Sequence, residues 1–146
     1  MTKGAEMARV VLVQQGGLHT IFQVGSGVGL NRPNSKGDVA LVQFFLEQSR
    51  RLWGGGKAIS MDGICGKGTI EAIVEFQHAV NRYYKMPIVK TDSAVDPLRT
   101  IPLMEGSPST LGQLHLFYTR AQPAYYPFIH KISSFKAELV PELFKL

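Results

Sequence analysis

The pattern of hydrophobic and polar positions changes several times along this 146-residue chain. Two short runs rich in β-branched and apolar residues, 10–13 and 18–24, flank the polar sequence Gln14-Gln15-Gly16-Gly17. This arrangement predicts a β-hairpin closed by a glycine turn. Closely spaced glycines, a proline and polar residues fill 25–37, as is typical of a loop. We therefore expect a hairpin followed by a separate, helical part of the chain.

From residue 38 the apolar residues recur at helical spacing. Asp38 is placed to cap the start of this first helix, and three glycines at 54–56 end it. A second helix is expected after Gly66, where apolar residues again recur at helical spacing. It should end before Pro87, because the residue before a proline is disfavoured in a helix. The apolar faces that predict the two helices comprise Val39, Val42, Phe45 and Leu46, and then Ile70, Ile73, Val74, Gln77 and Val80.

The pattern weakens in the C-terminal third. Prolines and a glycine interrupt residues 98–108, and an aromatic loop is expected between the prolines at 123 and 127. Leu114, Leu116 and Tyr118 alternate with other residues, which predicts a strand that could pair with the N-terminal hairpin. Ser134 is placed to open a final amphipathic helix. No clear full-length internal repeat is evident.

Composition narrows the choice of partners and compartment. The formal charge of +5 and the pI of about 9.5 favour anionic partners, but the basic residues are dispersed and do not form the runs typical of nucleic-acid arms. Cys65 is the only cysteine, so neither an internal disulfide nor a cysteine-based zinc site is expected. No Sec signal and no apolar run of about 18 residues is found, which predicts a cytoplasmic protein as synthesised, without membrane insertion. Transfer to the periplasm or cell wall would need a non-Sec route.

Candidate catalytic groups do not form a pattern that fits an enzyme. The four histidines show no pair at i, i+4 and no H-E-x-x-H motif, and the chain lacks a G-x-S-x-G elbow. Residues 25–29 fall short of G-x-G-x-x-G, and no helix is expected to start there. We therefore predict a noncatalytic protein without a metal or cofactor.

Three ordered segments carry a resemblance to a known family. They are GDVALVQFFL at 37–46, MDGICGKGT at 61–69 and AIVEFQ at 72–77. Together they resemble the peptidoglycan-binding domain family, small three-helix modules that read roughly G-x-x-V-x-x-Q-x-x-L, then D-G-x-x-G-x-x-T, then A-[VI]-x-x-F-Q. A further segment, 90–97, resembles the closing turn of these modules. Lys67 departs from the usual proline and Cys65 from the usual aromatic. Asp38 and the spacing of the first segment also depart slightly from the commonest form. The matching positions are Gly37, Val39, Gln43, Leu46, Asp62, Gly63, Gly66, Thr69, Phe76 and Gln77.

Most of these matches have a structural explanation. Asp62 and Gly63 can form a turn in which the glycine takes a positive φ and the aspartate bonds nearby amides. Thr69 could satisfy an amide in the first turn of the second helix. Gln77 could bond loop backbone across the helix pair. These roles explain a fold before they explain a ligand.

The sequence thus predicts a mainly α protein, α+β overall. A three-helix, peptidoglycan-binding-like core at 30–98 is expected between an N-terminal hairpin at 1–29 and a C-terminal strand and helix at 99–146. The resemblance implies noncatalytic binding of the peptide stem or glycan of bacterial peptidoglycan. Asp62, Arg82, Tyr83 and Tyr84 are the candidate ligand-binding residues, although for any single residue a solvated arginine or a half-buried tyrosine that closes the helix pair is the favoured explanation. The alternative is an adaptor or structural subunit of a phage or contractile secretion apparatus that binds a co-encoded protein.

Overall fold

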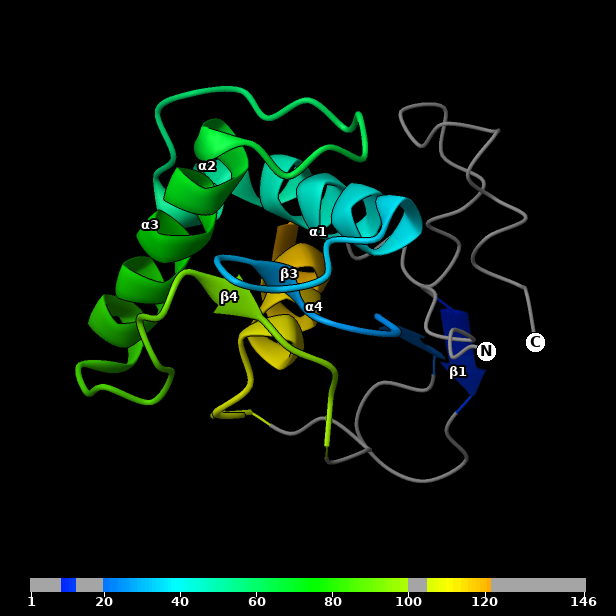
Figure 1. Cartoon of the computed structure of the whole chain (residues 1–146). Helices are drawn as coiled ribbons and strands as arrows, with labels where there is room; N and C mark the ends of the chain where they lie inside the picture. Colours follow the sequence, from blue (N-terminus) through cyan, green and yellow to red (C-terminus); the bar gives the residue numbers. More distant parts are fainter. Residues whose placement is uncertain (1–8, 13–19, 100–104, 122–146) are drawn as a thin grey trace.

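The computed structural model describes residues 9–12, 20–99 and 105–121 (Figure 1). Helices dominate this part of the chain, and the predicted mainly α class with a small β component is confirmed. The helices are α1 Lys36–Gln48, α2 Arg50–Trp53, α3 Lys67–Tyr84 and α4 Thr110–Ala121. The strands are β1 Arg9–Leu12, β2 Thr20–Gln23, β3 Val28–Gly29 and β4 Ala94–Val95.

Helix α1 lies at the centre of the fold, where α3, α4 and β3 all contact it (Figure 1). Every residue from Gly37 to Leu46 is buried, which explains why its apolar positions extend beyond a single stripe. The predicted capping role of Asp38 is wrong. Its carboxylate is buried in the first turn and accepts hydrogen bonds from the backbone N–H groups of Gly25 and Ser26, at 3.0 and 2.9 Å. Asp38 therefore fixes the preceding loop to the helix, and burial raises the pKa of this carboxyl.

Helix α3 follows the prediction closely. It starts directly after Gly66 and ends before Lys85, whose φ of 59° terminates the helix in the left-handed region. Ile73, Phe76 and Val80 are fully buried, whereas the opposite face carries exposed charged and polar residues.

Helix α4 occupies the place where a strand was predicted. The alternation of Leu114, Leu116 and Tyr118 was misleading, because the buried apolar positions recur every three or four residues. They are Leu111, Leu114, Phe117 and Tyr118. The hydroxyl of Ser109 accepts a hydrogen bond from the Gly112 N–H at 3.1 Å and so caps the first turn. The expected pairing of this segment with the hairpin as a strand is therefore wrong as well.

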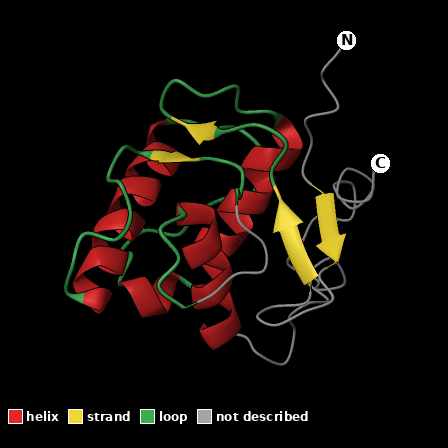
Figure 2. Cartoon of the chain, turned by 90° about the horizontal axis from the view of Figure 1, so that it is seen from below, coloured by secondary structure: helices red, strands yellow, loops and turns green. Residues whose placement is uncertain are grey.

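The predicted hairpin is confirmed as β1 and β2, which pair antiparallel with Arg9 opposite Gln23 and lie at one edge of the helical part (Figure 2). Its turn lies outside the described residues. A second antiparallel pair, β3 with β4, was not predicted. Gly29 has a φ of 118°, and its α-carbon lies so close to the Ser93 carbonyl that no side chain would fit. This close approach allows the short pair to form.

One hydrophobic core joins α1, α3 and α4 to β2, β3 and β4. At its centre Phe45 packs against Phe22, Phe44 and Tyr118, with ring centroids 5.5 to 6.3 Å apart. Phe22 lies before the predicted 30–98 module and Tyr118 lies after it, so the core extends beyond that module on both sides. The third long helix of the core is α4, which comes from the segment predicted as an extension. The final helix expected from Ser134 and the aromatic loop expected between the prolines at 123 and 127 lie outside the described residues.

In the described ranges, every helix is too short or too polar to cross a lipid bilayer.

Candidate functional site

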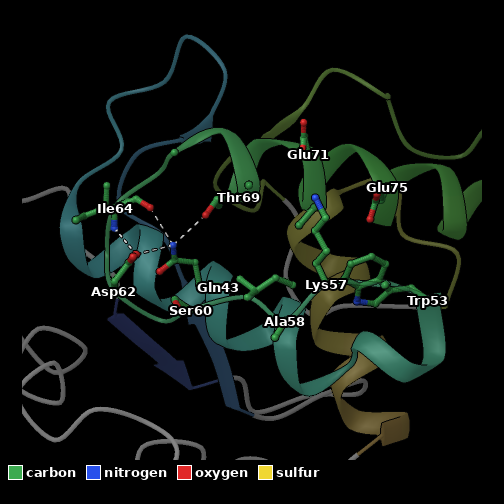
Figure 3. A pocket seen from close by; sticks show the side chains of 15 residues that line it. Gln43, Trp53, Lys57, Ala58, Ser60, Asp62, Ile64, Thr69, Glu71 and Glu75 are labelled. Carbon is green, nitrogen blue, oxygen red and sulfur yellow. Dashed lines mark hydrogen bonds between the residues drawn. The ribbon is translucent and has the colours of Figure 1, made fainter.

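Gln43, in the middle of α1, holds the loop that leads into α3. Its amide nitrogen Nε2 lies 3.0 Å from three acceptors, which are Asp62 Oδ1, the Ile64 carbonyl and Thr69 Oγ1 (Figure 3). Its oxygen Oε1 accepts a hydrogen bond from the Gly63 N–H at 2.9 Å. We call these five residues the first clasp. Gln43 is only 1% exposed, so these hydrogen bonds satisfy a buried side-chain amide, whereas Asp62 and Ile64 of the clasp reach the surface.

The turn inside the first clasp has the predicted geometry. Gly63 has a φ of 75°, and Asp62 Oδ1 accepts a hydrogen bond from the Ile64 N–H at 3.0 Å. A side chain at position 63 would also meet Lys36, because a Cβ there would lie 2.6 Å from Lys36 Cγ and 3.2 Å from its carbonyl oxygen. Glycine is therefore favoured by both conformation and space. The prediction for Thr69 is corrected, since its hydroxyl accepts from Gln43 and belongs to the clasp.

A second clasp repeats this arrangement around Gln77 in α3. Its Nε2 lies 3.1 Å from Asp92 Oδ1, 3.0 Å from the Ala94 carbonyl and 3.1 Å from Thr110 Oγ1. Its Oε1 accepts from the Ser93 N–H at 3.0 Å, and Asp92 Oδ1 accepts from the Ala94 N–H at 3.1 Å. Each residue of the first clasp thus has a counterpart that uses the same atoms. The expectation that Gln77 bonds loop backbone is confirmed.

The first clasp forms one end of a groove of about 460 Å³, which we call the first groove (Figure 3). The loop of residues 56–62 forms one wall, and the N-terminal half of α3 forms the other. Trp53 lies at the far end, buried, with its indole N–H donating to the Leu46 carbonyl at 3.1 Å and its ring packed edge-on against Phe76. Small residues line much of the rest, so backbone is accessible to a ligand.

The charges of the first groove differ from those of the whole chain. Asp62, Glu71 and Glu75 contribute three carboxylates, and Lys57 contributes one ammonium group (Figure 3). Glu71 also lies 4.0 Å from Lys67, in an exposed pair that screening makes weak. The groove is therefore locally acidic although the chain is basic, and it suits ligands with ammonium groups or hydroxyl groups.

The four candidate ligand-binding residues do not form one site. Asp62 belongs to the first groove, whereas Tyr83 and Tyr84 lie at the opposite end of α3, which is 18 residues and therefore about 27 Å long. Arg82 is exposed and lines a neighbouring hollow, which shares Trp53 and Glu75 with the first groove but does not include Asp62.

Tyr84 connects α3 to the loop before α4. Its hydroxyl donates to Glu105 of the loop before α4, and Arg120 of α4 pairs with the same carboxylate. The Tyr84 hydroxyl holds the pKa of Glu105 below its usual range, with a further contribution from Arg120. The Arg120 guanidinium also lies 4.8 Å from the centre of the Tyr83 ring, which is 55% exposed. Tyr84 therefore fits the alternative of a half-buried tyrosine that joins two helices.

Neither of the described histidines, His78 and His115, lines the first groove. His115 is buried in α4, where its Nε2 accepts from the Phe22 N–H and its Nδ1 donates to the Leu111 carbonyl, both at 2.9 Å. Burial lowers its pKa to about 4, so it is neutral at pH 7. His78 is exposed on α3, and His19 and His130 lie outside the described residues. Among the residues whose placement is described, no three histidine, cysteine or acidic side chains are grouped to hold a metal ion.

Comparison of the chain with protein-family models, curated proteins and solved structures gives no significant match.

Proposed function

We propose that this chain is a noncatalytic recognition module of the peptidoglycan-binding kind, and that the first groove receives the peptide stem or glycan of peptidoglycan. The observation that carries the proposal is the first clasp. Gln43, Asp62, Gly63 and Thr69 are all positions of the family pattern, and they lie in one hydrogen-bonded unit at one end of a groove.

The polar groups of the groove support recognition in preference to bond cleavage. The amide of Gln43 and the Oδ1 atom of Asp62 already bond within the clasp, so they hold the shape of the site. The accessible surface includes backbone, small residues, the Lys57 ammonium group, the Ile64 side chain and the carboxylates of Glu71 and Glu75. Such a surface can bond the hydroxyl groups of a glycan and the amino groups of a stem peptide.

A protein ligand is the second candidate, and one observation favours it. Ile64 lines the groove and is 69% exposed, the most exposed of the large apolar side chains in the described ranges. Exposed apolar side chains beside a groove are typical of protein contacts. In this case the module would be an adaptor or structural subunit of a phage or contractile secretion apparatus.

Co-sedimentation with purified sacculi tests the proposal. The informative variant is Gly68→Trp, because Gly68 lines the groove and a Cβ at this position meets no atom within 4 Å. The indole should therefore obstruct the groove without disturbing the clasp. Thr91→Trp is the matched control, since Thr91 is exposed and lines neither wall of the groove.

We expect sacculi to retain the wild type and the control, and to retain Gly68→Trp roughly ten-fold less, as for loss of about 1.4 kcal/mol of binding free energy. If the wild type remains in the supernatant, the assignment of peptidoglycan as the ligand is wrong. Retention of Gly68→Trp at the wild-type level would show that peptidoglycan does not bind in the first groove.

A further inference from the structure

The second clasp also borders a groove, and this groove has no role in the proposed function. It has a volume of about 480 Å³, similar to that of the first groove. Asp92, Ala94 and Thr110 of the clasp line it, as Asp62, Ile64 and Thr69 line the first groove. We call it the second groove. Each of the two clasps, which have the same pattern of hydrogen bonds, therefore borders a groove of its own.

The two grooves differ in charge at corresponding places. When the sequences of α3 and α4 are aligned at the two clasp threonines, Thr69 and Thr110, the acidic Glu71 and Glu75 correspond to Gly112 and Leu116. The second groove instead carries two basic side chains, Lys90 and Arg99, and serine hydroxyl groups from residues 107 and 109. An anion is therefore favoured in the second groove, whereas a cation is favoured in the first.

The two carboxylates of the second groove are already engaged. Asp92 accepts hydrogen bonds from Gln77 and Ala94, and its second oxygen lies 3.9 Å from Arg32. Asp96 forms a two-point ion pair with Arg32, at 2.6 and 3.1 Å. Lys90 and Arg99 are exposed, and neither forms an ion pair within the described part of the chain. Three cationic groups, Arg32, Lys90 and Arg99, therefore surround the two carboxylates, and Lys90 and Arg99 also lower the pKa of Asp96 by longer-range attraction. Because there is one more cation than anion, the exposed Lys90 and Arg99 are available to an anionic ligand.

The rest of the lining indicates which kind of anion fits. Ile88, Pro97 and Pro108 add apolar surface beside the two basic groups. A simple ion would leave this surface in water, whereas a peptide covers apolar surface and presents carboxylates together. We infer that the second groove is a separate binding site for an acidic peptide segment, held by Lys90 and Arg99 and by apolar contacts. This inference does not depend on what the first groove binds.

The test uses the full chain labelled with nitrogen-15 and a triglutamate peptide with a C-terminal amide as the probe. Amide resonances of the second groove should shift and saturate as the peptide is added, and the affinity should fall as salt is raised. The Lys90→Glu/Arg99→Glu variant should bind roughly ten-fold more weakly, because two charge contacts of this exposed type are lost. Both residues are exposed, so the fold should be retained, and circular dichroism checks this.

The matched control is Lys67→Glu/Arg51→Glu, which makes the same change in net charge on exposed residues that line neither groove. It should bind triglutamate within about two-fold of the wild type. Equal weakening in both double variants would mean that net charge alone attracts the peptide, and the site would be rejected. Inorganic phosphate binding as tightly as triglutamate would reject the peptide assignment. Gly68→Trp should still bind triglutamate, so failure here is distinct from failure of the first groove.

Discussion

The two clasps share their hydrogen bonds but differ in the chain that closes them. In the first clasp Thr69 is the seventh residue after Asp62, whereas in the second Thr110 is the eighteenth after Asp92. The turn residue is glycine in the first clasp and serine in the second, and both have a positive φ. The comparison teaches that the buried glutamine amide sets the geometry, while loop length and side chains vary around it.

The largest effect should come from removing either glutamine. Gln77→Leu and Gln43→Leu should each lower the free energy of unfolding by about 4 kcal/mol, because buried backbone and side-chain partners are left without hydrogen bonds. Urea denaturation measures this, with Thr91→Leu on the exposed surface as a control expected within about 0.5 kcal/mol. If the two losses differ by more than about 2 kcal/mol, the clasps are not energetically equivalent.

Acid should weaken the second clasp before the first. His115 lies in the same helix as Thr110, and burial lowers its pKa to about 4 from an ordinary value of about 6.5. The unfolded chain therefore binds the proton more readily, and stability is full above pH 6.5. It should fall by about 1.4 kcal/mol per pH unit between pH 6.5 and 4, or about 3 kcal/mol in all.

Hydrogen exchange distinguishes the clasps during this acidification. The amides of Ser93 and Ala94 should exchange faster at pH 4.5 than the amides of Gly63 and Ile64, after correction for the intrinsic effect of pH. His115→Gln, which cannot titrate, should remove most of the difference. Asp38 works in the opposite direction, because burial raises its pKa and its protonation favours the folded state. Loosening of both clasps together would show that α4 does not act on the second clasp alone.

A smaller effect is expected at the turn of the first clasp. Gly63→Ala should lower the free energy of unfolding by about 1.5 kcal/mol, because alanine is strained at a φ of 75° and its Cβ would crowd Lys36. Gly56→Ala is the matched control, since a Cβ there meets no atom within 4 Å. The control should be neutral or slightly stabilising in thermal denaturation.

The ion pair that borders the second clasp should contribute less. Arg32→Gln removes the contact with Asp96, whose pKa Arg32 holds below its usual range, but the two side chains are 30% and 51% exposed. After allowance for solvent screening we expect a loss of about 0.5 kcal/mol. This loss should disappear in 1 M salt, a concentration at which the Debye length is about 3 Å. A loss that persists in high salt would indicate packing and not charge.

The smallest effect should come from Ser93→Gly in the turn of the second clasp. Glycine relieves the cost of a φ of 62° but increases the entropy of the unfolded chain. The two terms oppose each other, so the change in the free energy of unfolding should stay within about 0.5 kcal/mol. A loss above 1 kcal/mol would mean that the serine side chain, and not only its backbone, holds this clasp.

Much of the fold was predictable because it depends on local pattern. The hairpin, α3 and the turn at Asp62 and Gly63 were predicted and are confirmed. The first predicted helix is present, but it is divided at Ser49 into α1 and α2. The strand at Leu114 was wrong because alternating apolar residues in a short segment fit either a strand or a buried helix.

The candidate site was less predictable because its contacts are distant in sequence. Gln77 bonds Asp92 and Thr110, which are separated from it by irregular segments. The sequence pattern does not indicate the path of these segments in space. The signal for a second clasp was present in the Asp-Ser-Ala of residues 92–94, which matches Asp-Gly-Ile of residues 62–64. The serine concealed it, because serine is uncommon where φ is positive. Arg82 and Tyr84 were chosen for their residue type, and only the fold shows that α3 carries them away from Asp62.

The bond from the Phe22 N–H to His115 spans 93 residues, and the bonds between Gln23 and Leu98 span 75. During synthesis, α1 and α3 emerge before α4 and expose the apolar side chains that α4 later covers. Contacts between such distant residues slow folding, and open apolar surface promotes aggregation in the meantime. A nascent chain of this protein is therefore a strong candidate for protection by chaperones until α4 has left the ribosome.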